Sequence, residues 1–146
     1  MCFTLYVGTE KPLPLIEWKK EAPDICVERI PDNQVGMKVY FSMPVVQYVG
    51  STSGCGCDFP HWENVQGQVQ PEDFDPRDED EKRSNQENVA ALLKLLRESG
   101  EPEWEIYGVW NGDCTDSPSA VKSIALADIE KPNFLFIERV FYRVRR

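Results

Sequence analysis

The sequence predicts a single α+β domain, residues 1–146, in which one main helix packs on one face of a mixed or antiparallel sheet. The order of the segments supports this fold class, because strand-like segments come first, one helix-like segment follows, and more strand-like segments close the chain. The composition agrees, since 41% hydrophobic and 11% aromatic residues are sufficient for a buried core.

Three segments before the helix have the pattern of strands. Residues 2–8 alternate apolar and polar side chains, and a shorter run at 24–29 does the same. Along residues 36–49 the apolar side chains recur at every second position, which predicts a longer extended segment. Pro44 interrupts this segment, and because proline has no amide hydrogen we expect a bulge, a bend or an edge position there.

The helix is expected at about residues 85–99. Ser84 and Glu87 have the spacing of a capping box at its start, and Gly100 follows its last turn. Four apolar residues repeat at helical spacing: Val89, Leu92, Leu93 and Leu96. This stripe predicts that the helix packs against the protein's own sheet.

Three further segments after the helix are expected to be extended. Residues 104–110 form a strand followed by an Asn111-Gly112 turn, and residues 121–126 form a short strand before a turn at 127–131. The chain then closes on a strand over residues 134–145. The sheet is therefore expected to combine segments that precede the helix in the sequence with segments that follow it.

Residues 63–83 lack periodicity, and their acidic side chains outnumber Arg77, Lys82 and Arg83. We expect a mobile acidic loop here. A structureless segment of this length inside a domain is usually functional or disordered. The loop is therefore a candidate contact surface for a protein partner.

The net charge of −9 excludes nucleic acid and anionic membrane as default partners, because the protein repels phosphate groups. No segment has the length of a membrane span, and the start of the chain has no secretory pattern, so we expect a cytoplasmic protein. In a reducing cytosol the five cysteines are expected to be free thiols or metal ligands rather than disulfides. Oligomeric state is not predicted.

The chemically richest segment is the loop Gly54–Trp62, which holds Cys55, Cys57 and the only histidine, His61. These three side chains could supply three of the four ligands of a tetrahedral zinc ion. The fourth ligand would come from another part of the chain, with Cys114, Cys26 and Cys2 as candidates. We therefore predict a metal site of Cys55, Cys57, His61 and Cys114.

Three other interpretations of the same cysteines stay open. Cys55 and Cys57 could form a strained, redox-responsive disulfide. An enzyme could use Cys57 or Cys55 as the nucleophile with His61 as the base, or an N-terminal Cys2 exposed by removal of Met1. In a non-enzymatic interaction module the cysteines would be only structural.

Several motifs resemble a family of small uncharacterised bacterial proteins. They are the initial Met-Cys-x-Thr-Leu-Tyr strand, the Pro-Leu-Pro after it, the Gly-Cys-Gly-Cys-Asp-Phe loop and the later Trp-Asn-Gly-Asp. The resemblance spans most of the chain, and the loop at residues 54–59 is its most specific part. That family has no established activity, so the resemblance implies no catalytic role.

Overall fold

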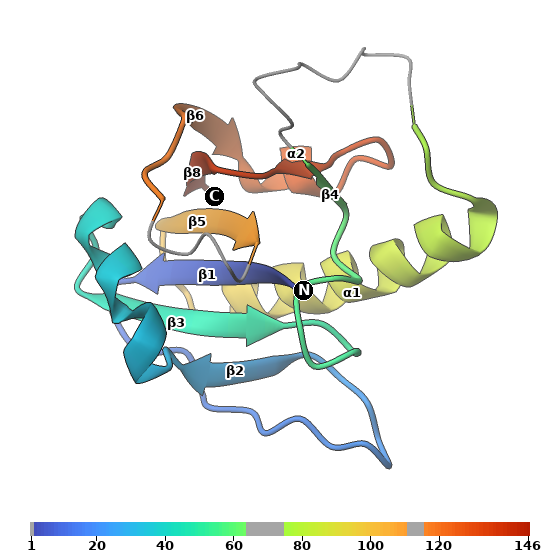
Figure 1. Ribbon diagram of the computed structural model, residues 1–146, viewed down its shortest axis with the longest axis horizontal. Coiled ribbons are helices and arrows are strands. Elements are labelled where there is room, and N and C mark those ends of the chain that lie inside the picture. Colours follow the sequence, from blue (N-terminus) through green and yellow to red (C-terminus); the bar gives the residue numbers. More distant parts are fainter. Residues whose placement is uncertain (1, 64–74, 111–115) are drawn as a thin grey trace.

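The computed structural model describes residues 2–63, 75–110 and 116–146, and it confirms the α+β class. Its centre is a six-stranded sheet of order β2-β3-β1-β5-β8-β6 (Figure 1). The strands are β1 (Phe3–Thr9), β2 (Cys26–Arg29), β3 (Val45–Gly50), β5 (Glu103–Trp110), β6 (Ala120–Ala125) and β8 (Val140–Arg145). All six coincide with segments expected to be extended, although β3 and β8 are shorter than expected.

The sheet is mixed, because β6 runs parallel to β8 whereas every other neighbouring pair is antiparallel. The connection between β6 and β8 contains the short helix α2 (Leu126–Ile129) and the strand β7 (Phe136–Ile137). β7 pairs in parallel with β4 (His61–Trp62), which the sequence analysis did not predict. This small second sheet holds the end of the cysteine loop beside β7.

Helix α1 (Glu79–Glu98) covers one face of the sheet and lies behind it in Figure 1. Its predicted apolar stripe is buried in the main core, where it meets Phe3 and Leu5 of β1 and Trp104 and Ile106 of β5. Burying this stripe is the main favourable contribution of the helix, since each large apolar side chain contributes about 1.5–3 kcal/mol.

The helix begins earlier than expected. Asp78, not Ser84, is the N-cap, and its carboxylate accepts a hydrogen bond from the amide of Glu81 at 2.8 Å. Acidic side chains in the first turn stabilise a helix N-terminus, so part of the predicted acidic loop is helical. Residues 64–74 of that loop lie outside the described residues.

The prediction of an extended segment over residues 36–49 is wrong in its first half. Residues Asp32–Tyr40 form a 3₁₀ helix, η1, and only Val45–Gly50 are a strand. Pro31 precedes η1 with an extended backbone, and its carbonyl accepts a 2.8 Å hydrogen bond from the amide of Gln34 in the first turn. Met37 is the buried apolar residue of η1. Met37 packs with Tyr6 and Tyr107 on the sheet face opposite α1, in a second apolar cluster.

The expected strand over residues 134–145 is divided in two. Arg139 has a φ of 62°, a left-handed conformation that breaks the extended backbone between β7 and β8. The turn expected at 127–131 is largely the helix α2. The Asn111-Gly112 turn lies outside the described residues.

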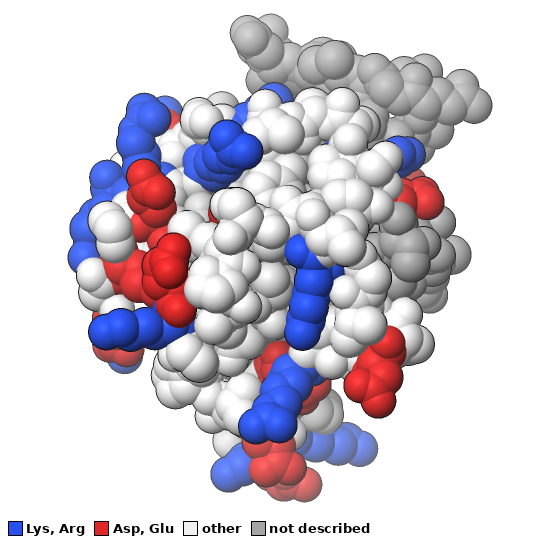
Figure 2. Space-filling view, turned by 90° about the vertical axis from the view of Figure 1, so that its left-hand side faces the viewer, with Lys and Arg blue, Asp and Glu red and all other residues white. Residues whose placement is uncertain are grey.

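No helix in the described parts of the chain has the length and hydrophobicity needed to cross a bilayer. Figure 2 shows lysine and arginine side chains standing among acidic ones around a broad uncharged area. On this face, therefore, the excess negative charge of the sequence does not form a field of one sign.

Candidate metal centre

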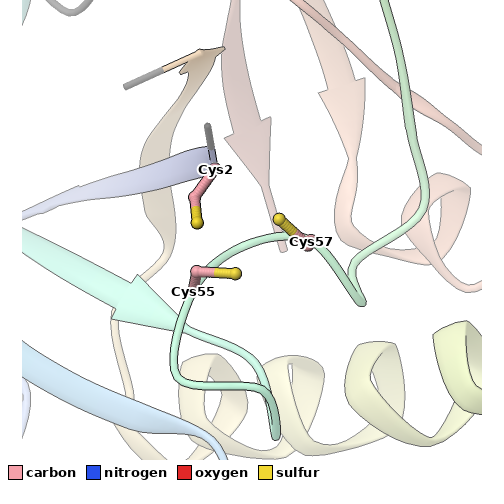
Figure 3. Close-up of side chains that lie close together, drawn as sticks. All are labelled: Cys2, Cys55 and Cys57. Atoms are coloured by element: carbon pink, nitrogen blue, oxygen red, sulfur yellow. The ribbon is translucent and has the colours of Figure 1, made fainter. Parts of the chain in front are cut away.

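Three cysteines from two distant parts of the sequence meet at one end of β1. Cys2 precedes β1, whereas Cys55 and Cys57 lie in the loop between β3 and β4. Their Sγ atoms all lie within 4.8 Å of one another, and Figure 3 shows the three sulfurs facing a common space. Cys2 is exposed and the other two are half-buried. We call these three residues the thiol trio.

The loop is held against β1 at Gly56. Its amide donates a 2.8 Å hydrogen bond to the carbonyl oxygen of Phe3. A Cβ at position 56 would lie only 2.7 Å from that same oxygen, so the approach requires glycine. Because Gly56 separates Cys55 from Cys57 and Phe3 follows Cys2, this contact brings the two loop thiols to Cys2.

The first part of the loop forms a tight turn around Ser51, which is fully buried. The amide and the hydroxyl of Ser51 both donate hydrogen bonds to the carbonyl of Cys55, at 2.6 and 2.5 Å. Gly54 has a φ of 85° and donates its amide to the Ser51 carbonyl. The Tyr48 hydroxyl donates to the Gly54 carbonyl at 2.9 Å. These bonds fix the backbone on the N-terminal side of Cys55.

Two buried asparagines of α1 hold the loop on both sides of its cysteines. The Asn88 side-chain oxygen accepts a 2.9 Å hydrogen bond from the amide of Thr52, and the Asn85 amide group donates to the carbonyl of Asp58 at 2.7 Å. Both asparagines are at most 3% exposed. Since buried polar groups need partners, these contacts fasten the loop to the helix.

The environment separates the two loop thiols chemically. Burial, together with a hydrogen bond to Cys55, raises the pKa of Cys57 to about 12. Burial also opposes ionisation of Cys55, but hydrogen bonds with Ser53, Cys57 and Cys2 outweigh that effect and lower its pKa below the ordinary value. Cys55 is therefore the thiol of this pair that ionises first.

His61 has a structural environment rather than a place in the trio. Its ring stacks on Phe3 with centroids 4.3 Å apart and an interplanar angle of 8°, and it meets Trp110 edge to face. Its Nδ1 is hydrogen-bonded to the carbonyl of Phe59 at 2.8 Å. The cluster of ligand atoms within 4.8 Å does not include His61.

The predicted ligand set thus has two members in the cluster, Cys55 and Cys57. Cys2, which the sequence suggested as an alternative fourth ligand, is the third. Cys114 lies outside the described residues, so its part in a metal site stays a prediction. Cys26 is a free, fully buried thiol that burial holds at a raised pKa.

Sequence reasoning missed the residues that position the thiols, namely Gly56, Ser51, Asn85 and Asn88. A signal for the asparagines was present, because they continue the buried face of Leu92 toward the N-terminus of the helix. Polar residues at such positions indicate a buried hydrogen-bonding partner. No comparable local signal pointed to Ser51.

The chain matches no protein-family model, no curated protein and no solved structure. The resemblance to a bacterial family therefore stays a prediction.

Proposed function

We propose that the protein binds one divalent thiophilic metal ion, zinc by default, through Cys2, Cys55 and Cys57. The observation that carries this proposal is the convergence of three sulfurs within 4.8 Å. A zinc–sulfur bond is about 2.3 Å long, so thiolates on one tetrahedral ion lie about 3.8 Å apart. Small side-chain rotations would bring the trio to that spacing.

The surroundings of the trio support a metal site. The loop backbone is fixed to β1 through Gly56 and to α1 through Asn85 and Asn88, so little conformational entropy is lost on binding. Exposed Cys2 gives an ion access from solvent. A reducing cytoplasm would keep the thiols available, and we propose that location.

The fourth coordination position distinguishes two kinds of zinc site. Structural sites have four protein ligands, whereas sites with three keep an open position for water or substrate. Cys114 follows Trp110, which pairs with Phe3 beside Cys2. Four residues span at most about 14 Å, so Cys114 remains our candidate for the fourth ligand.

Redox response is a second candidate function, and the same sulfur spacing favours it. Hydrogen peroxide would oxidise two thiols: two S–H bonds and the O–O bond break, one S–S bond and two O–H bonds form, and two waters are released. Cys2 is the accessible member of the trio. A bridge from Cys2 to the loop would avoid the strained ring that Cys55 and Cys57 would form with each other.

Titration of the reduced protein with Cd²⁺ tests the metal proposal, because cadmium–thiolate bonds absorb in the near ultraviolet. We expect one ion per chain, and a marked loss of affinity in Cys2→Ser and Cys55→Ser. Cys26→Ala is the matched control, since it removes a buried thiol outside the trio. Cys114→Ser distinguishes a fourth thiolate from an open position.

Two results would refute the proposal. One is the absence of thiolate absorption in the wild-type protein, and the other is equal Cd²⁺ affinity in wild type and Cys55→Ser. If neither metal binding nor reversible oxidation were found, the cysteines would be structural. A protein-interaction module would then be the remaining function.

A further inference from the structure

The trio supplies ligands of one chemical kind. Among the described residues, the cluster consists of three thiols and includes neither an imidazole nor a carboxylate. The neighbouring carboxylate of Asp58 accepts from the Thr52 hydroxyl at 3.4 Å, and His61 Nδ1 is bonded to Phe59. A purely sulfur site favours the softest ions.

Soft ions differ in the net charge of the complex that each would form with three thiolates. Three thiolates give a negatively charged complex with Zn²⁺ and a more negative one with Cu⁺, whereas a trivalent ion gives a neutral complex. No lysine or arginine occurs between Gly50 and Trp62. Within the described parts of the chain, no ion pair joins a cation to this loop.

A neutral complex is therefore the one that this site stabilises at least cost. Cys55 and Cys57 are half-buried, and Cys57 packs against the main apolar core. An uncompensated charge in such a position is costly, because it loses hydration without gaining a partner. Neutrality would remove that cost.

We propose that the thiol trio binds trivalent arsenic, taken up as arsenous acid, through all three sulfurs. The proposal rests on the same convergence of sulfurs as the proposed function, but it does not require zinc binding. Three As–O bonds and three S–H bonds break, three As–S bonds form, and three waters are released. No electron is transferred, so no oxidant or reductant is needed.

The experiment is titration of the protein with arsenite under a phosphine reductant, which carries no competing thiol. Intact mass spectrometry should show the addition of one arsenic atom with the loss of three hydrogens. A thiol-reactive dye should find three fewer reactive cysteines. Cys26→Ala should give the same mass change, because Cys26 is not part of the trio.

A monosubstituted arsenical separates three-thiol from two-thiol binding. Phenylarsine oxide uses two thiols and releases one water, so it does not need the whole trio. We expect Cys2→Ser to weaken arsenite binding at least about tenfold, a loss of about 1.4 kcal/mol, and to weaken phenylarsine oxide binding less. Because Cys2 is exposed, this variant should fold normally.

Failure of this inference is distinguishable from failure of the proposed function. Cd²⁺ binding without arsenite binding would overturn the inference and leave the metal site intact. Arsenite binding without Cd²⁺ binding would overturn the proposed metal function and leave the inference intact. Equal arsenite affinity in wild type and Cys2→Ser, or loss of only two hydrogens, would show that the trio does not act as a unit and would overturn the inference.

Discussion

Replacing Gly56 by alanine should disrupt both the fold around the loop and the thiol trio. The added Cβ would lie 2.7 Å from the Phe3 carbonyl oxygen, and 3.2 Å from both the carbonyl carbon and a ring carbon of the same residue. Backbone atoms cannot move aside as a flexible side chain can. The loop must therefore shift away from β1.

The expected loss of stability follows from the contacts that this shift of the loop breaks. Losing the hydrogen bond from Gly56 to Phe3 costs about 1 kcal/mol, and overpacking a tight contact costs about 1–3 kcal/mol. We expect Gly56→Ala to lower the free energy of unfolding by about 2–4 kcal/mol. Cd²⁺ affinity should fall about 10- to 100-fold, because the two loop thiols move away from Cys2.

Urea denaturation of the metal-free protein measures the first effect, and Cd²⁺ titration of the folded protein measures the second. Gly100→Ala is a control outside the loop: Gly100, unlike Gly56, has a positive φ of 71°, and no atom lies within 4 Å of its added Cβ. It should cost about 1–2 kcal/mol of backbone strain and leave Cd²⁺ affinity unchanged. A Gly56→Ala protein with wild-type stability and affinity would refute the reasoning.

Three further predictions concern the surroundings of the site and the start of α1. Asn88→Ala should lower the free energy of unfolding by about 1–3 kcal/mol in urea denaturation, because the amide of half-buried Thr52 loses its acceptor. Hydrogen bonds with Arg77 hold the pKa of Asp75 at about 2, below the unfolded value of about 3.9. The resulting stabilisation, about 1 kcal/mol after solvent screening, should be complete above about pH 4 and lost as the pH falls through 2, and Asp75→Asn should abolish this step. Alkylation followed by mass spectrometry as the pH is raised should label Cys55 before Cys57, since the pKa of Cys55 is lowered and that of Cys57 is raised.

Each of these has a clear contrary result. Gln86→Ala, on an exposed position of α1, is the control for Asn88→Ala, and equal denaturation midpoints for the two variants would exclude the asparagine as an anchor. An unchanged pH profile in Asp75→Asn would show that its ion pair does not contribute to stability. Labelling of Cys57 at lower pH than Cys55 would contradict the inferred hydrogen bonding among the thiols.

Local patterns predicted most of the fold because they reflect burial directly. The alternation in β1 and the 3.6-residue stripe of α1 both mark side chains that face the core. Such patterns failed where the backbone rather than burial decides the conformation. η1 begins after Pro31 and leaves Val39 exposed, although the apolar residues there alternate as in a strand. The left-handed backbone of Arg139 divides the last strand, although its neighbours also alternate.

The site was predictable only in part, for a related reason. Cys55 and Cys57 are close in sequence, so their spacing alone indicated a shared site. Cys2 lies beside the loop thiols because of the contact between Gly56 and Phe3. This contact joins distant segments and leaves no local pattern in the sequence. For His61 the sequence could not show that the ring would stack on Phe3.

The separation of Cys2 from the loop thiols has a consequence for folding kinetics. The trio can assemble only after β1 lies beside the loop, so its complete ligand set depends on contacts between distant segments, which we expect to form late in folding. An ion that needs all three sulfurs would therefore bind after the rate-limiting step. It would lengthen the lifetime of the native state by slowing unfolding, while the rate of folding stayed the same.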